Sequence, residues 1–460
     1  MYRYGLRILL ADARGWWPAI TTIAMITALV GLCATQFAWA RDPRFVAAVE
    51  AQGRAVSEFT IVAQTIYVVV AALGVFALTV VGNATVEATR RTFAQWRLVG
   101  ASPRDVRHGI WALVATAALI GAVPGSFAAL VAAYFAVPIF NEMAAPGFAA
   151  PTLPPSPFAW FLSLAVGVLT CLLGAVGPAR RGARTRAIVV FRSTGVTPRR
   201  DGWWRVPAGA LLLVAALGMI VAASSVGPDT GVAALFNLSL YTGLCAVAAV
   251  YVLGPLVVPV ILMGFGHAAA CVGSVIGSLA AAAAVARAGT SANTVAPLAA
   301  GVGGIGVMLA SVESTAAVVT ARGDATATNL TDTLVLAGLI SVVLLVTSAA
   351  VIALASRDRD REQALLRVAG MPRRQVTAWY GWQALQLALA GVVLAVVPVA
   401  LTVTAAAVGS PAFAGRSVVS VPWAVPVFGF ALIWLVLSLV LWLPARTSLR
   451  AEPAAGLRAA

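Results

Sequence analysis

The sequence predicts an all-α polytopic membrane protein with about ten transmembrane helices, organised as two related four-helix cores joined by two extra helices. Of its 460 residues, 61% are hydrophobic and 10% are charged, whereas a soluble domain carries about 25% charged residues. The apolar residues are concentrated in runs of about 20 residues or more, the length that a membrane-spanning helix needs. Two sequence repeats then relate the first four runs to the last four.

Ten apolar runs are predicted to be helices, because backbone polar groups inside a bilayer need partners within the protein and these runs lack the alternation of barrel strands. In chain order they are Trp17–Ala40, Thr60–Asn83, Gly109–Val137, Pro157–Gly177, Val206–Ser225, Ala234–Met263, Ala292–Val318, Thr331–Ala355, Gly381–Val408 and Pro422–Leu443. The first run is longer than the apolar region of a signal peptide. We therefore interpret it as a retained helix, although Ala38-Trp39-Ala40 resembles a cleavage site.

The distribution of basic residues predicts the orientation. All 31 basic residues are arginines, against 16 acidic residues, which gives a net charge of +15. If both termini are cytoplasmic, the outer loops contain only Arg41, Arg44, Arg54, Arg322 and Arg416. This matches the positive-inside rule and predicts a multi-pass protein of the bacterial plasma membrane. Nucleic acid is not an expected partner, since the arginines do not gather on one soluble face.

The first repeat follows the second and the eighth run. RTFAQWRLVGASPRDV begins at Arg91, and REQALLRVAGMPRRQV begins at Arg361. When the two strings are aligned from these arginines without gaps, the matched positions are Arg91, Ala94, Arg97, Gly100, Arg104 and Val106 in the first copy and Arg361, Ala364, Arg367, Gly370, Arg374 and Val376 in the second.

A second repeat lies where the fourth and tenth runs end. PARRGARTRAIVVFR from Pro178 matches PARTSLRAEPAAGLR from Pro444, and its two copies are separated by almost the same length of chain as those of the first repeat. Two matches at nearly one offset indicate a duplication. They predict a first core over 1–200, a two-span connector over 201–270 and a second core over 271–460.

The first repeat has a predictable local structure. The three-residue spacing within Arg91–Arg97 places the matched residues on one face of a short cytoplasmic helix. Gly100 and Gly370 suit the left-handed position that ends a helix. In the first copy, Ser102 and Asp105 have the spacing of a capping box at the start of the next helix.

At these residues the chain resembles the FtsX-like (MacB-type) permeases of ATP-binding cassette transporters. The family pattern A-x-L-R-x-x-G is matched by Ala364, Leu366, Arg367 and Gly370, whereas the first copy has Trp96 in place of leucine. The resemblance implies that each copy contains a coupling helix, which docks on a separate ATPase subunit that binds ATP and Mg. With two such helices, one chain would serve an ATPase dimer, with membrane lipids as further partners.

This resemblance predicts the membrane subunit of a transporter that moves or extracts a lipophilic substrate. Many family members have a large outer domain, but the outer segments Arg41–Phe59 and Ala321–Leu330 are too short to bury a stable core. Two alternatives remain: an ion-coupled secondary transporter, and a permease that transmits ATPase motion as a signal without transport.

Several sequence features exclude other chemistry. The chain has no lysine, so it cannot form the phosphate-binding loop G-x-x-x-x-G-K-[ST]. GVGGIG from Gly301 resembles a dinucleotide-binding motif, but it lies in a predicted membrane helix, where glycines allow close packing. His108 and His267 are too few for a metal cluster. The four cysteines, Cys33, Cys171, Cys245 and Cys271, lack metal-ligand spacing, and no catalytic residue is predicted.

Two further features carry weaker predictions. Glu313 is the one acidic residue well inside an apolar run. It is either a solvated or arginine-paired carboxylate near the outer end of its helix, or a substrate or ion site. The segment Met1–Trp16, with arginines near one helical face and leucines on the neighbouring face, is expected to lie along the inner membrane surface.

Overall fold

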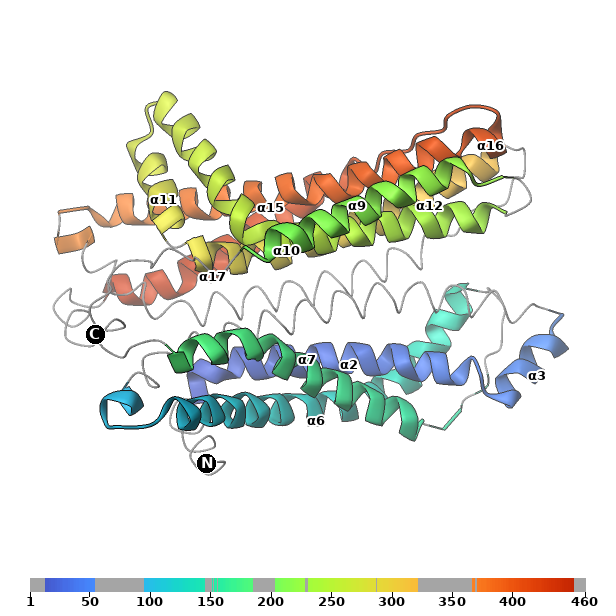
Figure 1. Cartoon of the computed structure of the whole chain (residues 1–460), viewed down its shortest axis with the longest axis horizontal. Helices are drawn as coiled ribbons and strands as arrows, with labels where there is room; N and C mark the ends of the chain where they lie inside the picture. The colour runs from blue at the N-terminus through green and yellow to red at the C-terminus, as the bar shows by residue number, and fades with distance from the viewer. Residues whose placement is uncertain are drawn as a thin grey trace. The chain divides into compact units, whose positions relative to one another are not determined.

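The computed structural model describes residues 13–53, 95–144, 151, 153–154, 156–184, 203–227, 231–286, 288–321, 366–368 and 370–450, in which every regular element is a helix (Figure 1). Eight of the ten predicted runs fall in these residues and are helical; Thr60–Asn83 and Thr331–Ala355 lie outside them. Six of the described helices are long and apolar enough to cross a membrane. The chain is thus an all-α, multi-pass membrane protein.

The helices carry the labels of Figure 1. They are α2 (Ala13–Trp39), α3 (Pro43–Ala51), α6 (Pro103–Ala144), α7 (Pro157–Arg184), α9 (Arg205–Ser224), α10 (Val232–Cys271), α11 (Val275–Ala286), α12 (Ala288–Ala321), α15 (Arg373–Gly409), α16 (Pro411–Ala414) and α17 (Ala424–Arg450). The described residues form two compact units, the first with α2, α3, α6 and α7 and the second with α9 to α17. The helices α7 and α17 end at arginines that the second repeat pairs with each other.

In the first unit, small residues allow α2 and α6 to pack closely. A Cβ added to Gly121 would lie 2.8 Å from the carbonyl oxygen of Ile20, and a Cβ on Gly125 would clash with the backbone of Ala24. Because the contacts advance together along both helices, α2 and α6 are parallel. The two glycines are therefore packing sites.

The helix α7 completes the described part of this bundle and runs antiparallel to α2. Gly167 of α7 lies against Thr27, whereas Ser163 lies against Gly31, further along α2. Ile26 of α2 is fully buried. The first apolar run is thus a core helix of the bundle, as expected for a retained span.

A short helix, α3, follows α2 at the end of the first unit opposite to the start of α6. Its N-cap is Asp42, whose carboxylate accepts a 2.9 Å hydrogen bond from the Arg44 backbone N–H. Phe45 of α3 is buried. The indole N–H of Trp39 donates to the Pro154 carbonyl (3.1 Å) and so ties α2 to the segment before α7.

In the second unit, α12 and α15 are also parallel. A Cβ on Gly303 would lie 3.0 Å from Cγ of Pro398, and a Cβ on Gly306 would contact Val399. The string GVGGIG therefore lies inside a packed membrane helix. Gly303 and Gly306 make room for α15, as the packing interpretation predicts.

The helix α10 packs against both α12 and α15, and α9 packs against α10. Gly243 of α10 faces Val307 of α12 and Thr402 of α15, whereas Gly254, further along α10, faces Ala296. Thus α10 is antiparallel to α12. The helices α9 and α10, which correspond to the predicted two-span connector, belong to the same compact unit as the described helices of the second core.

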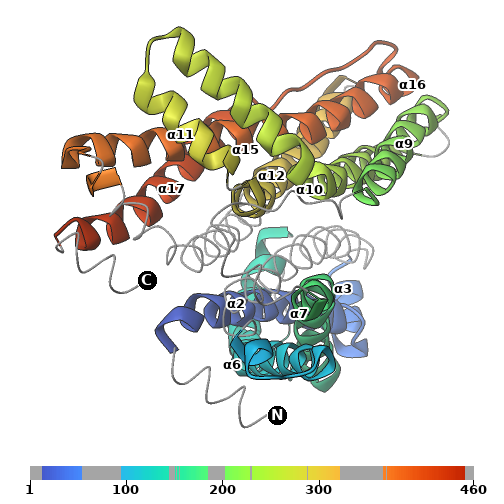
Figure 2. The same cartoon turned by 60° about the vertical axis from the view of Figure 1, so that its left-hand side comes forward.

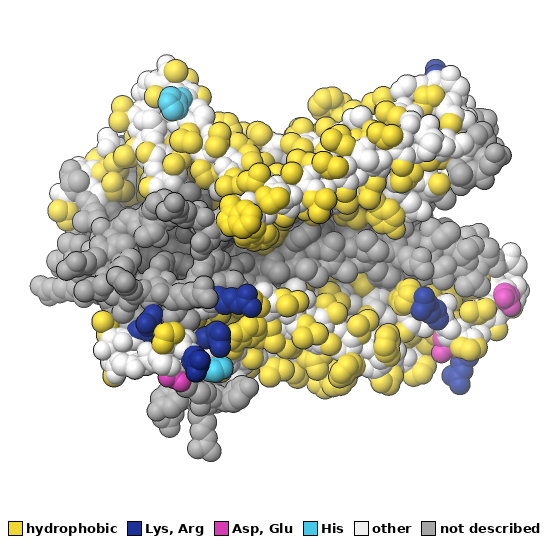
Figure 3. All heavy atoms as spheres, in the orientation of Figure 1, with side chains coloured by type: hydrophobic (Ala, Val, Ile, Leu, Met, Phe, Trp, Pro, Cys, Tyr) yellow, Lys and Arg dark blue, Asp and Glu magenta, His cyan; other side chains and the backbone are white. Residues whose placement is uncertain are grey.

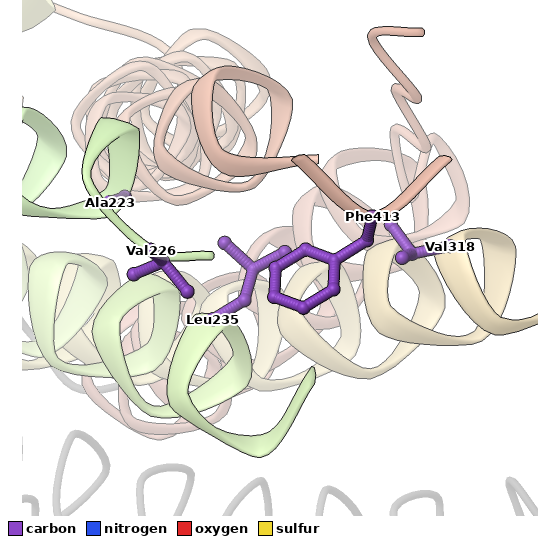
Figure 4. Packing of buried hydrophobic residues seen from close by; sticks show 5 residues of the cluster. All are labelled: Ala223, Val226, Leu235, Val318 and Phe413. Atoms are coloured by element: carbon purple, nitrogen blue, oxygen red, sulfur yellow. The ribbon is translucent and has the colours of Figure 1, made fainter. Parts of the chain in front are cut away.

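An apolar cluster closes the end of the second unit that lies opposite to the start of α15 (Figure 4). Side chains from α9, the following turn, α10, α12 and α16 meet there: Ala223, Val226, Leu235, Val318 and Phe413. These contacts join the connector helices to the end of α12 and to the short helix after α15.

Candidate functional site

The first sequence repeat forms two similar turns, each between a short helical segment and a long membrane helix. We call residues 95–106 elbow 1 and residues 366–376 elbow 2. Four of the predicted site residues, Arg91, Ala94, Arg361 and Ala364, lie outside the described residues. The other eight are described, four in each elbow.

In elbow 1, a glycine with positive φ ends the short helical segment. Gly100 has a φ of 99°, a conformation that is strained for other residues. Its N–H donates to the Arg97 carbonyl (3.2 Å), and the Ala101 N–H donates to the Trp96 carbonyl (3.0 Å). These two bonds form a Schellman motif, which satisfies the last carbonyls of a helix.

Elbow 2 repeats the motif bond by bond. Gly370 has a φ of 91°. Its N–H donates to the Arg367 carbonyl (3.1 Å), and the Met371 N–H donates to the Leu366 carbonyl (3.0 Å). Each donor and each acceptor occupies the position that the first repeat pairs with its counterpart in elbow 1. The predicted glycine turns are confirmed in both copies.

The long helix of elbow 1 begins with the predicted capping box. The Ser102 hydroxyl accepts from the Asp105 N–H (3.2 Å), and the Ser102 N–H donates to the Asp105 carboxylate (3.2 Å). Asp105 is exposed and precedes the apolar run that starts at Gly109. Hydrogen bonds from the Ser102 side chain and backbone lower its pKa from the ordinary value. In elbow 2, Pro372 is the N-cap and makes no side-chain cap.

A buried valine anchors each long helix directly after the turn. Val106 and Val376 are both 0% exposed, whereas Arg104 and Arg374 lie on the exposed side. The valines thus fix the start of α6 and of α15 in their bundles. The arginines remain available at the surface of each elbow.

The tips of the elbows expose apolar side chains beside arginines. Leu98 and Val99 are 61% and 89% exposed, and Val368 is 64% exposed. Figure 3 shows arginines gathered where α6 begins, next to hydrophobic surface. Charged and apolar groups side by side at a helix turn suit contact with another protein rather than with lipid alone.

Sequence reasoning missed the role of Trp96. Its ring lies over Gly109 of α6, because a Cβ on Gly109 would be 2.7 Å from Cζ3 of the indole. The equivalent positions of the second copy are Leu366 and Trp379. Two features of the sequence could have indicated this contact. Trp96 replaces the leucine that is usual at its position, and Gly109 stands where the second copy has a tryptophan.

Glu313 lies on α12, near the end of the second unit that holds α16. Its carboxylate accepts a 3.0 Å hydrogen bond from the Ser420 hydroxyl, in the segment before α17. The side chain is half-buried. Among the described residues it has a serine of the adjacent loop as a hydrogen-bond partner.

Two buried amides of α15 were also missed, although glutamine in an apolar run is itself a signal. Gln383 and Gln386 are each 2% exposed. The Gln386 side-chain N–H donates to the Gly277 carbonyl of α11 (2.9 Å). Its Oε1, and that of Gln383, find no protein partner among the described residues.

Comparison with models of known protein families gives a match over both copies. The model of the FtsX-like permease C-terminal family matches residues 65–187 and 334–453, which together make up more than half of the chain. The first matched segment contains elbow 1 and the first copy of the second repeat up to residue 187. The second matched segment contains elbow 2 and the later copy of the second repeat up to residue 453. No curated protein and no solved structure matches the chain.

Proposed function

This chain belongs to the FtsX-like permease family, and from that premise we propose that it is the membrane subunit of an ATP-binding cassette transporter. In this proposal a separate ATPase binds ATP and Mg and drives the movement or extraction of a lipophilic substrate. The chain would have no ATPase site of its own, since the lysine of a phosphate-binding loop is missing from its sequence.

One observation carries the proposal: the two elbows have the same hydrogen-bonded turn at positions that the first repeat pairs with each other. An arginine that only signals membrane topology requires charge but no fixed geometry. A matched Schellman turn with an exposed apolar tip supports a docking element. Each elbow would insert its tip into a groove of one ATPase subunit, with its arginines at the rim.

The duplication supports one chain per ATPase dimer. Each ATPase subunit would contact one elbow, so a single chain supplies both docking points. A homodimer of this chain would supply four elbows and leave two without a subunit.

The packing above each elbow supports transmission of force. Elbow 1 is held to α6 by the contact between Trp96 and Gly109, and α6 is held to α2 at Gly121 and Gly125. Elbow 2 leads into α15, which packs on α12 at Gly303. Closely packed helices move as one body, because interiors are nearly incompressible. Closure of the ATPase would therefore tilt each core as a unit.

The test changes the exposed tips, where substitution leaves the fold intact. Val99→Asp combined with Val368→Asp places a charge on side chains that are 89% and 64% exposed. We expect loss of co-purification with the partner ATPase and loss of stimulated ATP hydrolysis. Val419→Asp, at a valine that is 57% exposed before α17, is the matched control and should leave both unchanged.

The same assay separates the alternatives. An unaltered complex in the doubly substituted chain would overturn the docking assignment. Stimulated ATP hydrolysis without flux of any lipophilic probe in proteoliposomes would favour a signalling permease. Flux driven by an ion gradient without ATP, abolished by Glu313→Gln, would favour a secondary transporter.

A further inference from the structure

The end of α10 and the helix α11 form an antiparallel hairpin that the sequence did not reveal. We call residues 259–286 the α10–α11 hairpin. Gly273, with a φ of 76°, makes the turn. Its N–H donates to the Ala270 carbonyl (2.9 Å), and the Ser274 N–H donates to the Ala269 carbonyl (2.9 Å). The hairpin therefore has a tight, hydrogen-bonded tip.

The helix α10, whose end forms the first arm of the hairpin, is longer than one membrane crossing needs. The helix α10 has 40 residues, or about 60 Å at 1.5 Å per residue, about twice the thickness of the bilayer hydrocarbon. Pro255 and Pro259 lie inside it, where a helix can bend. Figures 1 and 2 both show the last part of α10 and α11 leaning away from the other helices of their unit.

The hairpin carries no charged residue. From residue 230 to residue 286 the chain contains no aspartate, glutamate, lysine or arginine. Four of its exposed side chains are large and apolar: Val260, Met263, Val272 and Val275 are 60%, 45%, 83% and 77% exposed. His267 is the exposed polar side chain among them. Soluble surfaces rarely expose such a patch without an interacting phase or partner.

The seam between its two helices is made of small residues. A Cβ on Gly266 would lie 2.9 Å from Cβ of Ala281, and one on Gly277 would lie 3.0 Å from Cβ of Ala269. Close packing through glycine and alanine is typical of helix pairs in lipid, where apolar burial gives no driving force.

Each of the three polar side chains in the hairpin bonds to the hairpin's own backbone. A ring nitrogen of His267 lies 2.8 Å from the Met263 carbonyl, and the Ser278 hydroxyl donates to the Val275 carbonyl (3.0 Å). The Ser274 hydroxyl accepts from the Gly277 N–H (3.1 Å). Such local bonds lower the cost of placing these side chains in hydrocarbon, where water cannot supply the partner.

We propose that the α10–α11 hairpin lies in the lipid of the inner leaflet, with acyl chains covering its tip at Val272 and Val275. If the hairpin lay in the cytoplasm instead, its exposed apolar side chains would be in contact with water, which is unfavourable. A protein partner would require polar groups at the rim, and the hairpin has no charge for that purpose. Lipid hydrocarbon is the surrounding that matches both the charge-free sequence and the bonded polar side chains.

The hairpin is also linked to elbow 2. The Gln386 amide donates to the Gly277 carbonyl of α11, and Trp382 packs against Gly277. Both residues lie on α15 within four turns of its first residue, Arg373. On the basis of the proposed function, movement of elbow 2 would shift the hairpin within the leaflet. The substrate class would then be amphiphiles drawn from that leaflet.

The test measures the surroundings of the tip in the purified chain, without any ATPase. Cys271 is exposed at the tip and can carry a nitroxide once the other three cysteines are replaced by alanine. Collisions with oxygen, which concentrates in lipid, are compared with collisions with a water-soluble nickel chelate. Two control sites use a Cys271→Ala background: Val214→Cys on α9 for lipid and Val99→Cys at elbow 1 for water, at valines that are 64% and 89% exposed.

We expect the ratio of oxygen to nickel accessibility at Cys271 to match the Val214→Cys site and to be severalfold above the Val99→Cys site. A ratio near that of the Val99→Cys site would put the tip in water and overturn the proposal. Low accessibility to both reagents would mean that protein covers the tip, which also overturns it. Because no ATPase is present, none of these outcomes depends on the proposed docking of the elbows.

Discussion

The indole ring of Trp96 lies directly over Gly109, with only 2.7 Å between its Cζ3 and the position of a Cβ on that glycine. The short helical segment of elbow 1 is therefore packed onto α6 through one large side chain and one missing side chain. In the second copy the large residue stands on the long helix, as Trp379, and the elbow supplies Leu366. The two elbows have the same backbone turn. The large aromatic side chain lies in the short segment of elbow 1, whereas in the second copy it lies on the long helix.

Gly109→Ala should disturb elbow 1, because the indole must move to admit the new methyl group. Overpacking of this kind typically costs about 1–3 kcal/mol, so we expect a lower melting temperature of the purified chain and weaker ATPase binding. Gly381→Ala is the matched control. A Cβ on Gly381 meets nothing within 4 Å, so that variant should be neutral or slightly more stable.

The double variant Trp96→Leu with Gly109→Ala should recover stability relative to Gly109→Ala alone. Leucine is the residue at the equivalent position of elbow 2, and its smaller side chain leaves room for the methyl group. Equal melting temperatures for the single and the double variant would contradict the packing explanation.

The capping box predicts that the stability of elbow 1 depends on pH. Its hydrogen bonds lower the pKa of Asp105 below the ordinary value of 3.8, so the folded elbow favours the carboxylate. This contribution is present above the ordinary pKa and is lost as the pH falls through the lowered pKa. A nitroxide on Val99→Cys should gain mobility between neutral pH and about pH 3.

Elbow 2 serves as the internal control, since its N-cap is Pro372 and lacks a side-chain cap. A nitroxide on Val368→Cys should respond less over the same range. Ser102→Ala should cost about 0.5–2 kcal/mol and remove the difference between the elbows. Identical pH profiles at both sites would refute this account.

The two buried glutamines of α15 should respond differently to replacement by leucine. Gln386→Leu removes the bond to the Gly277 carbonyl, and interhelical bonds in membrane proteins average about 0.6 kcal/mol. Gln383→Leu removes an amide oxygen that has no partner among the described residues, which is expected to be neutral or stabilising. Nitroxide mobility at Cys271 should rise in the first variant only.

Glu313 is expected to position the loop before α17. Gln can still accept the hydrogen bond from Ser420, so Glu313→Gln should preserve ATP-driven flux. Glu313→Leu and Ser420→Ala should both remove the bond and increase proteolysis of the loop around Ser417 in right-side-out vesicles. Complete loss of flux in Glu313→Gln alone would instead assign the carboxylate to substrate or ion handling.

Much of the fold could be predicted because the bilayer imposes strict rules on sequence. Apolar runs of sufficient length must be helices, and the eight runs that lie in described residues are helical. The glycine turns and the capping box were also predictable, since positive φ and side-chain capping are local properties. The contact between Glu313 and Ser420 could not be predicted, because the two residues are distant in the sequence and only the folded bundle brings them together.

By itself, the sequence determined the membrane class, the helices, the internal duplication and the two elbow motifs, because each depends on residues that are close in the chain or on a fixed offset. Only the tertiary structure decided which helix faces met. It brought Trp96 onto Gly109, linked Gln386 to Gly277 and folded the end of α10 back as a charge-free hairpin. The physical reason is that an apolar residue satisfies lipid and protein neighbours equally well. Contacts inside a membrane bundle are therefore chosen by shape and a few hydrogen bonds.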